Sequence, residues 1–184
     1  MEIIRIIVGE IQTNCFLFVC GNELAVIDPG GEEERIVREI EKTRAEVKFI
    51  INTHCHFDHT LSNAGLKKKF NVPVLIHENE KDYLDFTPDR FLRDGEEIKI
   101  GECSLKVVLT PGHTAGSICL FAPGLVFSGD TIFEAGGVGR WDLPGGSVDD
   151  LRMSLEKLNG LIDPGTVIYP GHGGIFTFEK KQWI

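Results

Sequence analysis

Residues 54–59 of the 184-residue chain, with the sequence HCHFDH, contain three imidazoles and a carboxylate. They directly follow residues 47–51, a largely apolar run that predicts a strand buried on both faces. Because unpaired polar side chains are costly to bury, the fold must supply this segment with partners or metal ions. In extended backbone His54 and His56 project to the same side, which suits two ligands of one metal ion. The segment therefore predicts a metal site at the end of a buried strand.

Three more candidate ligands follow apolar runs. His113 lies in the segment TPGHT, Asp130 in SGDT and His172 in PGHG. Imidazole and carboxylate ligands suit zinc, manganese or iron(II), with zinc as the usual choice. Seven such side chains are too many for one tetrahedral site, whereas two metal ions that share a bridging carboxylate would use them all.

The rest of the chain predicts many strands and few helices. Short apolar runs separated by turn residues predict strands at residues 3–8, 15–19, 24–27, 47–51, 72–76, 98–100, 105–109, 118–121, 125–127 and 167–169. Helical patterns cover residues 32–42, 60–70 and 78–84 and the segment that follows Ser147. This order indicates two packed sheets with helices outside, an α+β (α/β) architecture.

Composition limits the partners of the chain. The formal net charge is −9, with 19 Lys and Arg against 28 Asp and Glu, which argues against nucleic acid or an anionic membrane as a partner. No apolar run approaches the roughly 18 residues that a membrane span needs. The length predicts a single domain over residues 1–184. The first residues show no secretory signal, so we expect a cytoplasmic protein.

The cysteines are scattered and odd in number. They are Cys15, Cys20, Cys55, Cys103 and Cys119, and they form no CxxC pair. This pattern favours reduced, mostly buried thiols over a disulfide framework.

Four segments together resemble the metallo-β-lactamase superfamily: THCHFDH at residues 53–59, TPGHT at 110–114, SGDT at 128–131 and PGHG at 170–173. Their order and spacing are similar to its glyoxalase II (hydroxyacylglutathione hydrolase) branch over most of the chain. The resemblance implies a four-layer αββα sandwich, in which helices flank two mixed β-sheets and the metal ions lie at one edge.

The resemblance also implies a ligand set for two divalent metal ions, zinc first and iron or manganese as alternatives. The set divides into ligands of the first ion, ligands of the second and a bridge: His54, His56 and His113; Asp58, His59 and His172; and Asp130. A hydroxide between the two ions would attack the acyl carbonyl of a small-molecule thioester, and Asp58 would be the catalytic residue that orients it.

The chain also departs from glyoxalase II. It ends twelve residues after His172, so we expect no helical C-terminal extension of the kind that helps those enzymes bind glutathione. Residues 136–146 resemble the shorter, single-domain members. Within them Arg140 occupies the place of a basic residue that contacts the thiol cofactor, and we expect it to bind a substrate carboxylate through the two-pronged guanidinium.

Other members of the superfamily suggest other functions. A persulfide dioxygenase would hold one iron ion through His54 or His56 with His113 and Asp130. A nucleic-acid hydrolase is disfavoured by the acidic charge, and a non-catalytic module by the complete ligand set. A periplasmic β-lactamase is disfavoured by the absence of a signal peptide.

Overall fold

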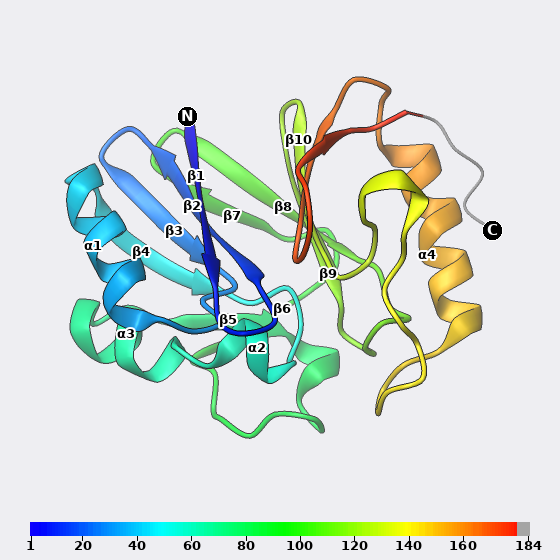
Figure 1. Ribbon diagram of the computed structural model, residues 1–184, viewed down its shortest axis with the longest axis horizontal. Helices are drawn as coiled ribbons and strands as arrows, with labels where there is room; N and C mark the ends of the chain where they lie inside the picture. The colour runs from blue at the N-terminus through cyan, green and yellow to red at the C-terminus, as the bar shows by residue number, and fades with distance from the viewer. Residues whose placement is uncertain (180–184) are drawn as a thin grey trace.

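Two six-stranded mixed β-sheets face each other in the computed structural model, which describes residues 1–179 (Figure 1). The first sheet has the order β1 (Glu2–Val8), β2 (Thr13–Cys20), β3 (Glu23–Ile27), β4 (Glu46–Ile51), β5 (Val74–His77) and β6 (Arg90–Leu92). The second has the order β12 (Phe176–Thr177), β11 (Val167–Pro170), β10 (Leu125–Gly129), β9 (Ile118–Ala122), β8 (Cys103–Leu109) and β7 (Glu97–Ile100).

Helices cover the outer faces of both sheets. Over the first sheet lie α1 (Glu33–Thr43) and α3 (Asn63–Phe70), and over the second lies α4 (Val148–Leu161). Ile36 and Leu66 pack on the first sheet, whereas Leu151 and Leu155 pack on the second. Phe16, like other inward residues of the two sheets, fills the core between them. The expected four-layer αββα fold is therefore confirmed.

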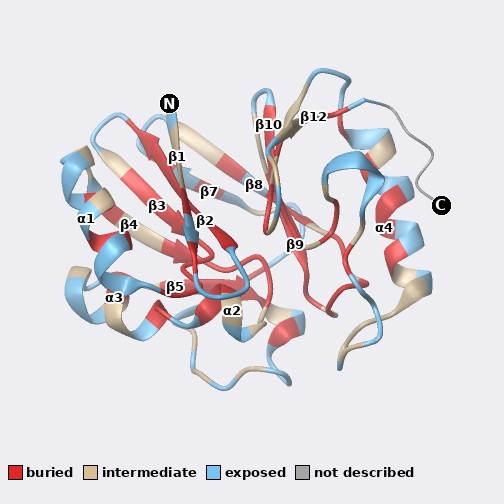
Figure 2. Ribbon diagram, viewed as in Figure 1, coloured by how far each residue is buried: buried red, intermediate tan, exposed pale blue. Residues whose placement is uncertain are grey.

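Coverage on both faces explains the apolar runs of the inner strands. Every residue of β2 is buried, and all but the first residue of β3 are buried as well (Figure 2). A strand with a core on each face needs apolar side chains in both directions, so its sequence does not alternate. The helices show the opposite pattern, with one buried face and one exposed face.

The structure differs from the sequence prediction in its short elements. The expected helix at residues 60–70 begins only at Asn63, as α3, and a separate short helix, α2 (Phe57–Thr60), precedes it. Of the expected helix at 78–84, only a 3₁₀ turn forms, η1 (Glu78–Glu80), and a second turn is η2 (Glu134–Gly136). The strands β6 and β12 are too short for a periodic pattern to reveal them. The prediction of one domain over residues 1–184 stays a prediction, and residues 180–184 lie outside the described part of the chain.

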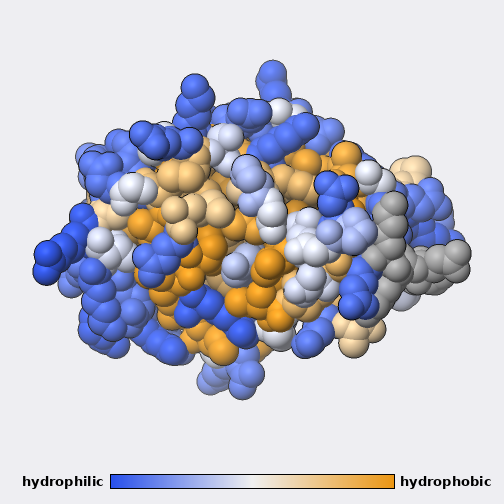
Figure 3. Space-filling view, turned by 90° about the horizontal axis from the view of Figure 1, so that it is seen from above, coloured by the Kyte–Doolittle hydropathy of each residue, from blue (hydrophilic) through white to orange (hydrophobic). Residues whose placement is uncertain are grey.

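The surface carries both polar and apolar side chains. Hydrophobic residues gather in the middle of the face seen from above, and hydrophilic residues surround them (Figure 3). In the described part of the chain no helix combines the length and apolar character needed to cross a membrane. Exposed apolar side chains occur singly on most proteins, so they do not identify a site by themselves.

A disulfide corrects the expectation that all cysteines are reduced. Cys20 and Cys103, 83 residues apart, are bonded, whereas Cys15, Cys55 and Cys119 are free as expected. Cys20 ends β2 and Cys103 begins β8, and both side chains lie between the sheets. The sequence conceals this pairing because the two residues meet only when the sheets pack face to face.

Thiol titration tests the disulfide. Protein purified without reductant and unfolded in denaturant should show three reactive thiols, and five after reduction, because one of its five cysteines pairs with another. The variant Cys103→Ser should show four thiols under both conditions. Five thiols in the unreduced wild-type protein would contradict the bond.

Candidate metal centre

The loops that follow several strands meet at one edge of the sandwich. β3 and β4 are parallel, so the loops beginning at Asp28 and Asn52 emerge at the same edge of the first sheet. β10 and β11 are also parallel, and the segments after them carry Asp130 and His172. The loop between β8 and β9 adds His113. The topology thus brings together side chains that are far apart in the sequence.

Hydrogen bonds between the sheets fix these loops relative to one another. The backbone amide of Asn14 donates to the Gly171 carbonyl at 2.7 Å, and its side-chain amide donates to the Pro170 carbonyl at 2.8 Å. The amide of Ile118 donates to the Thr53 carbonyl at 2.9 Å. Each sheet therefore positions the ligand-bearing loops of the other.

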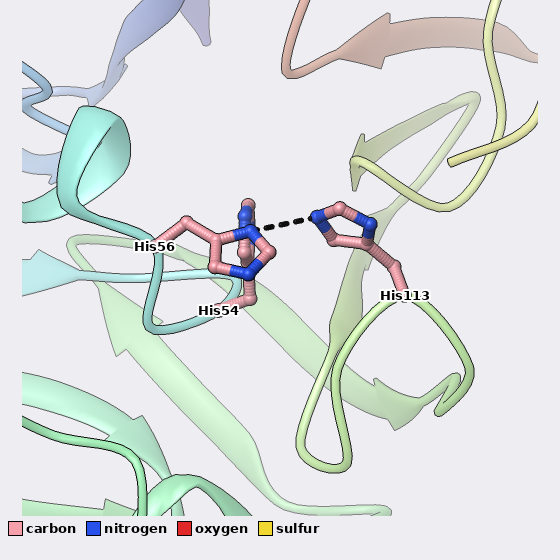
Figure 4. Close-up of side chains that lie close together, drawn as sticks. All are labelled: His54, His56 and His113. Atoms are coloured by element: carbon pink, nitrogen blue, oxygen red, sulfur yellow. Dashed lines mark hydrogen bonds between the residues drawn. The ribbon is translucent and has the colours of Figure 1, made fainter. Parts of the chain in front are cut away.

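Three histidines form the first cluster. His54 and His56 come from the loop after β4, and His113 approaches them from the loop after β8 (Figure 4). Their facing ring nitrogens lie close together, with His56 Nδ1 and His113 Nε2 2.9 Å apart. All three can present one nitrogen within 4.8 Å of the others. This is the grouping that the superfamily resemblance implies for the first metal ion.

The second cluster combines a carboxylate with two histidines. Asp58 Oδ2 lies 3.2 Å from His172 Nε2 and 3.4 Å from His59 Nε2. Asp130 lies between the clusters, with Oδ1 3.5 Å from His59 Nε2 and Oδ2 3.7 Å from His113 Nε2. The position of Asp130 suits a carboxylate shared by two ions.

The donor atoms themselves fit metal ions. His54 Nε2 and Asp130 Oδ1 are buried and have no hydrogen-bond partner within residues 1–179. Buried polar atoms without partners are rare, because each one loses its hydration. Imidazole nitrogens and carboxylate oxygens that converge in this way are the ligand types of zinc, iron and manganese sites.

The two clusters differ in charge. Burial, followed by repulsion from neighbouring imidazoles, holds the pKa of His54 well below its ordinary value. Burial and His113 lower the pKa of His56 to about 4. Both rings are therefore neutral at pH 7, the form of imidazole that can bind a metal ion.

The second cluster is a network of opposite charges. Burial opposes the charged form of His59, but Asp130 and Asp28 outweigh it and raise the pKa to about 9. Burial likewise opposes the charge on His172, yet the hydrogen bond to Asp58 raises its pKa. The same imidazoles hold the pKa of Asp58 below its usual range despite burial. The cluster is therefore held together by charge.

Asp28 orients histidines of both clusters. Its carboxylate lies 3.0 Å from His59 Nδ1 and accepts hydrogen bonds from the amide and hydroxyl of Thr53 at 2.7 and 2.6 Å. The Thr53 hydroxyl in turn lies 3.1 Å from His54 Nδ1. Partners of this kind fix the ring orientation and leave the other ring nitrogen free for a metal ion.

Two further contacts orient single ligands. The hydroxyl of Thr13 donates to Asp58 Oδ2 at 2.9 Å, and His113 Nδ1 lies 2.7 Å from the carbonyl of Arg140. Because a carbonyl oxygen can only accept, Nδ1 of His113 is the donor, and Nε2 is the nitrogen that faces the cluster.

Glu80 braces the loop that carries His113. Its carboxylate is fully buried, accepts from the hydroxyl of Thr114, and accepts from the Gly116 amide at 3.0 Å. On its other side Glu80 neighbours Cys55, which lies between two candidate ligands and whose pKa burial and Glu80 raise. Glu80 thus lies next to both loops that carry the histidines of the first cluster.

A cavity of about 680 Å³ opens onto both clusters. Arg140 lies on its wall, as the sequence predicts, with a side chain that is 62% exposed. Its Nε and Nη2 donate to the two carboxylate oxygens of Asp142 at 2.8 Å each. The Nε–Nη2 edge of the guanidinium therefore binds Asp142, whereas we expected the guanidinium to bind a substrate carboxylate in this way. Substrate binding by Arg140 stays a prediction.

All the candidate ligands named from the sequence meet at this edge. They are His54, His56, Asp58, His59, His113, Asp130 and His172. The supporting roles of Thr13, Thr53 and Glu80 were missed, since a single Thr or Glu carries no motif. For Asp28, one feature of the sequence could have pointed to a supporting role, namely its position at the end of a predicted strand, before Pro29.

Residues 8–172 match the sequence model of the Metallo-beta-lactamase superfamily, and the chain therefore belongs to that superfamily. Among similar proteins, the probable metallo-hydrolase MJ0888 of Methanocaldococcus jannaschii is 35% identical, over 89% of this chain and 89% of its own. The probable metallo-hydrolase YqgX of Bacillus subtilis is 32% identical, over 92% and 89%. The hydroxyacylglutathione hydrolase GloC of Haemophilus influenzae is 32% identical, over 99% and 95%.

Solved structures share the fold. The B3 metallo-beta-lactamase BLEG-1 superposes with a TM-score of 0.89 at 28% identity, covering 96% of this chain and 94% of its own. ETHE1 from Myxococcus xanthus gives a TM-score of 0.87 at 25% identity, over 96% and 80%. TTHA1623, solved in a di-iron-bound form, gives 0.85 at 32% identity, over 95% and 94%.

Gly171 tests whether the clusters act as one metal centre. A β-carbon at this position would lie against Asp130 Oδ1 and 2.7 Å from His59 Cε1. Gly171→Ala should therefore displace Asp130 and lower the bound metal by at least half in elemental analysis after dialysis. Gly160→Ala, where a β-carbon meets nothing within 4 Å, is the matched control and should keep its metal. Wild-type metal content in Gly171→Ala would show that Asp130 is not needed.

Proposed function

We propose that the chain is a binuclear metal-dependent hydrolase that acts on thioesters. The observation that carries this proposal is the arrangement of six donor side chains in two clusters with Asp130 between them. Members of both clusters and Asp130 line one cavity. Sites with two adjacent metal ions are typical of hydrolases, because the pair can stabilise both the attacking and the leaving atom.

The residues divide between two ions. His54, His56 and His113 would hold the first, and the ligands of the second would be Asp58, His59 and His172, with Asp130 common to both. Bound zinc, iron or manganese would supply Lewis acidity and hydroxide at neutral pH. Zinc suits this donor set best on general grounds.

The chain's own groups would orient water and substrate. Asp58 is fixed by Thr13 and lies on the cavity wall, where it can accept a hydrogen bond from the attacking water. Cys55 is an unsuitable nucleophile, since burial and Glu80 raise its pKa and keep it protonated. We therefore propose direct attack by water on the acyl carbonyl, with no covalent enzyme intermediate.

Similarity to known proteins supports a thioester as the substrate. The GloC protein named above is a hydroxyacylglutathione hydrolase that aligns over nearly the whole chain. A thioester is also an easy carbonyl to hydrolyse, because thiolate is a good leaving group. Arg140, on the cavity wall, is proposed to contact this small-molecule substrate.

A second candidate function is persulfide oxidation by a single iron ion. The similarity to the ETHE1 structure favours it, whereas TTHA1623, solved in a di-iron-bound form, shows that a similar chain can hold two iron ions. The ligands would be His54 or His56 with His113 and Asp130. The presence of a complete second cluster favours the hydrolase instead.

Parallel assays separate the two functions. Protein loaded with zinc, manganese or iron should release free thiol from thioesters, and it should consume no oxygen with glutathione persulfide. Treatment with a chelator should abolish thiol release, and added metal should restore it. Oxygen uptake with persulfide, without hydrolysis of any thioester, would replace the hydrolase with the dioxygenase.

Asp58 tests the mechanism. Asp58→Ala should lower kcat by at least about 100-fold, because a group that orients the attacking water contributes on this scale. Asp163→Ala removes an exposed carboxylate far from the centre and should leave kcat within about twofold. If Asp58→Ala turns over at the wild-type rate, Asp58 has no part in the reaction.

A further inference from the structure

The cavity wall beyond the metal centre is apolar. Ile11, Phe57, Phe133, Leu143 and Pro144 form most of it. The side chains of Ile11 and Phe57 are 54% and 62% exposed, although apolar groups of this size are normally covered. Exposed apolar side chains that gather at a cavity mark a binding surface for an apolar ligand.

The wall also has little free charge. Within residues 1–179, Arg140 is the only charged residue that lines this cavity apart from the candidate ligands. Asp142 matches its charge through two hydrogen bonds of 2.8 Å. The guanidinium keeps both N–H groups of Nη1 and one of Nη2, which can donate to a neutral carbonyl. A bound carboxylate would have to displace Asp142 or lie beside it.

A smaller cavity of about 290 Å³ adjoins the first one. The two share His56, Phe57 and Pro144 in their walls, so they meet beside the first cluster. The smaller cavity extends toward Tyr83 and Asp85, and its only formal charge at pH 7 is the Asp85 carboxylate. An anionic group here would be repelled.

A thioester has two arms, and the two cavities fit them. The larger cavity contains candidate ligands of both clusters, including Asp58 and Asp130, whereas the smaller reaches only His56. The carbonyl and the acyl arm therefore belong in the larger, apolar cavity. The thiol arm would pass His56 into the smaller cavity.

We propose that the substrate is a thioester of an apolar acyl group with an uncharged thiol. This inference rests on the hydrolase function proposed above and narrows its substrate class. In the reaction water adds its oxygen to the acyl carbon, the carbon–sulfur bond breaks, and a proton of the water ends on the thiol. The products are a fatty or aromatic carboxylic acid and the free thiol. The apolar wall stabilises the acyl arm by burial, whereas a negatively charged arm would lose hydration and would meet Arg140, whose charge Asp142 already balances.

A series of acyl N-acetylcysteamine thioesters tests the substrate class with an uncharged thiol. From acetyl through butyryl to hexanoyl, kcat/KM of the metal-loaded enzyme should rise about threefold or more per added methylene. Butyryl should exceed the anionic succinyl ester at least about tenfold. S-lactoylglutathione, with a polar acyl group and an anionic thiol, should be a poorer substrate than hexanoyl N-acetylcysteamine.

Phe57 supplies the matched variant. Phe57→Ala should lower kcat/KM for the hexanoyl ester at least about threefold more than for the acetyl ester. Phe57 also lines the smaller cavity, so a loss common to all esters reports the shared thiol arm, and the difference between the esters reports the acyl arm. Met153→Ala is the control, since Met153 is equally exposed, at 62%, and lies on α4 outside both cavities. It should leave the whole series unchanged.

Binding of unreactive analogues separates failure of this inference from failure of the proposed function. Methyl alkyl ketones of increasing length, titrated calorimetrically into metal-loaded and chelator-treated protein, should bind more tightly as the chain lengthens, and less so in Phe57→Ala. If no thioester is hydrolysed but this trend appears, the proposed function fails and the apolar site stands. If thioesters are hydrolysed with no gain from chain length, or with succinyl or lactoylglutathione preferred, the apolar substrate class is wrong and the hydrolase stands.

Discussion

Aromatic packing between the two sheets holds the site together. The ring of Phe16 in the first sheet lies 5.3 Å from that of Phe127 and 5.5 Å from that of Tyr169 in the second. Phe16 and Phe127 are buried, and full burial of a phenylalanine ring stabilises the fold by about 1.5–3 kcal/mol. Phe127 and Tyr169 each precede a candidate ligand by three residues, Asp130 and His172 respectively. The positions of these ligands therefore depend on a rigid core, with the disulfide closing the sheets at the other end of β2 and β8.

The candidate metal centre brings together imidazoles and carboxylates whose close approach is costly unless something binds them. Neutral imidazoles face one another in the first cluster, and carboxylates and imidazoles share charge in the second. A metal pair would resolve both arrangements, since it would accept the imidazole lone pairs and neutralise the carboxylates. The cavity beside this centre is lined mostly by apolar side chains, which can bind an apolar substrate group without acting as metal ligands themselves. The candidate metal ligands would thus carry out the reaction, and the adjacent apolar wall would select the substrate.

The candidate ligands could be named from the sequence because each lies in a short motif beside an apolar strand, and the structure brings them together. The four-layer fold followed from the superfamily resemblance, and apolar periodicity alone indicated only two packed sheets. The supporting contacts could not be predicted, since they join distant segments. Glu80 meets Thr114, and Cys20 meets Cys103, only after the chain has folded. The pairing of Arg140 with Asp142 is local, yet the sequence does not show which partner the guanidinium takes.

Anomalous X-ray diffraction from crystals saturated with zinc tests the central claim most directly. Data collected on both sides of the zinc absorption edge locate each ion independently of the protein. The account predicts two peaks, one among His54, His56 and His113 and one among Asp58, His59 and His172, with the Asp130 carboxylate between them. A single peak at the first cluster, with the second cluster empty at saturating zinc, would contradict a binuclear centre.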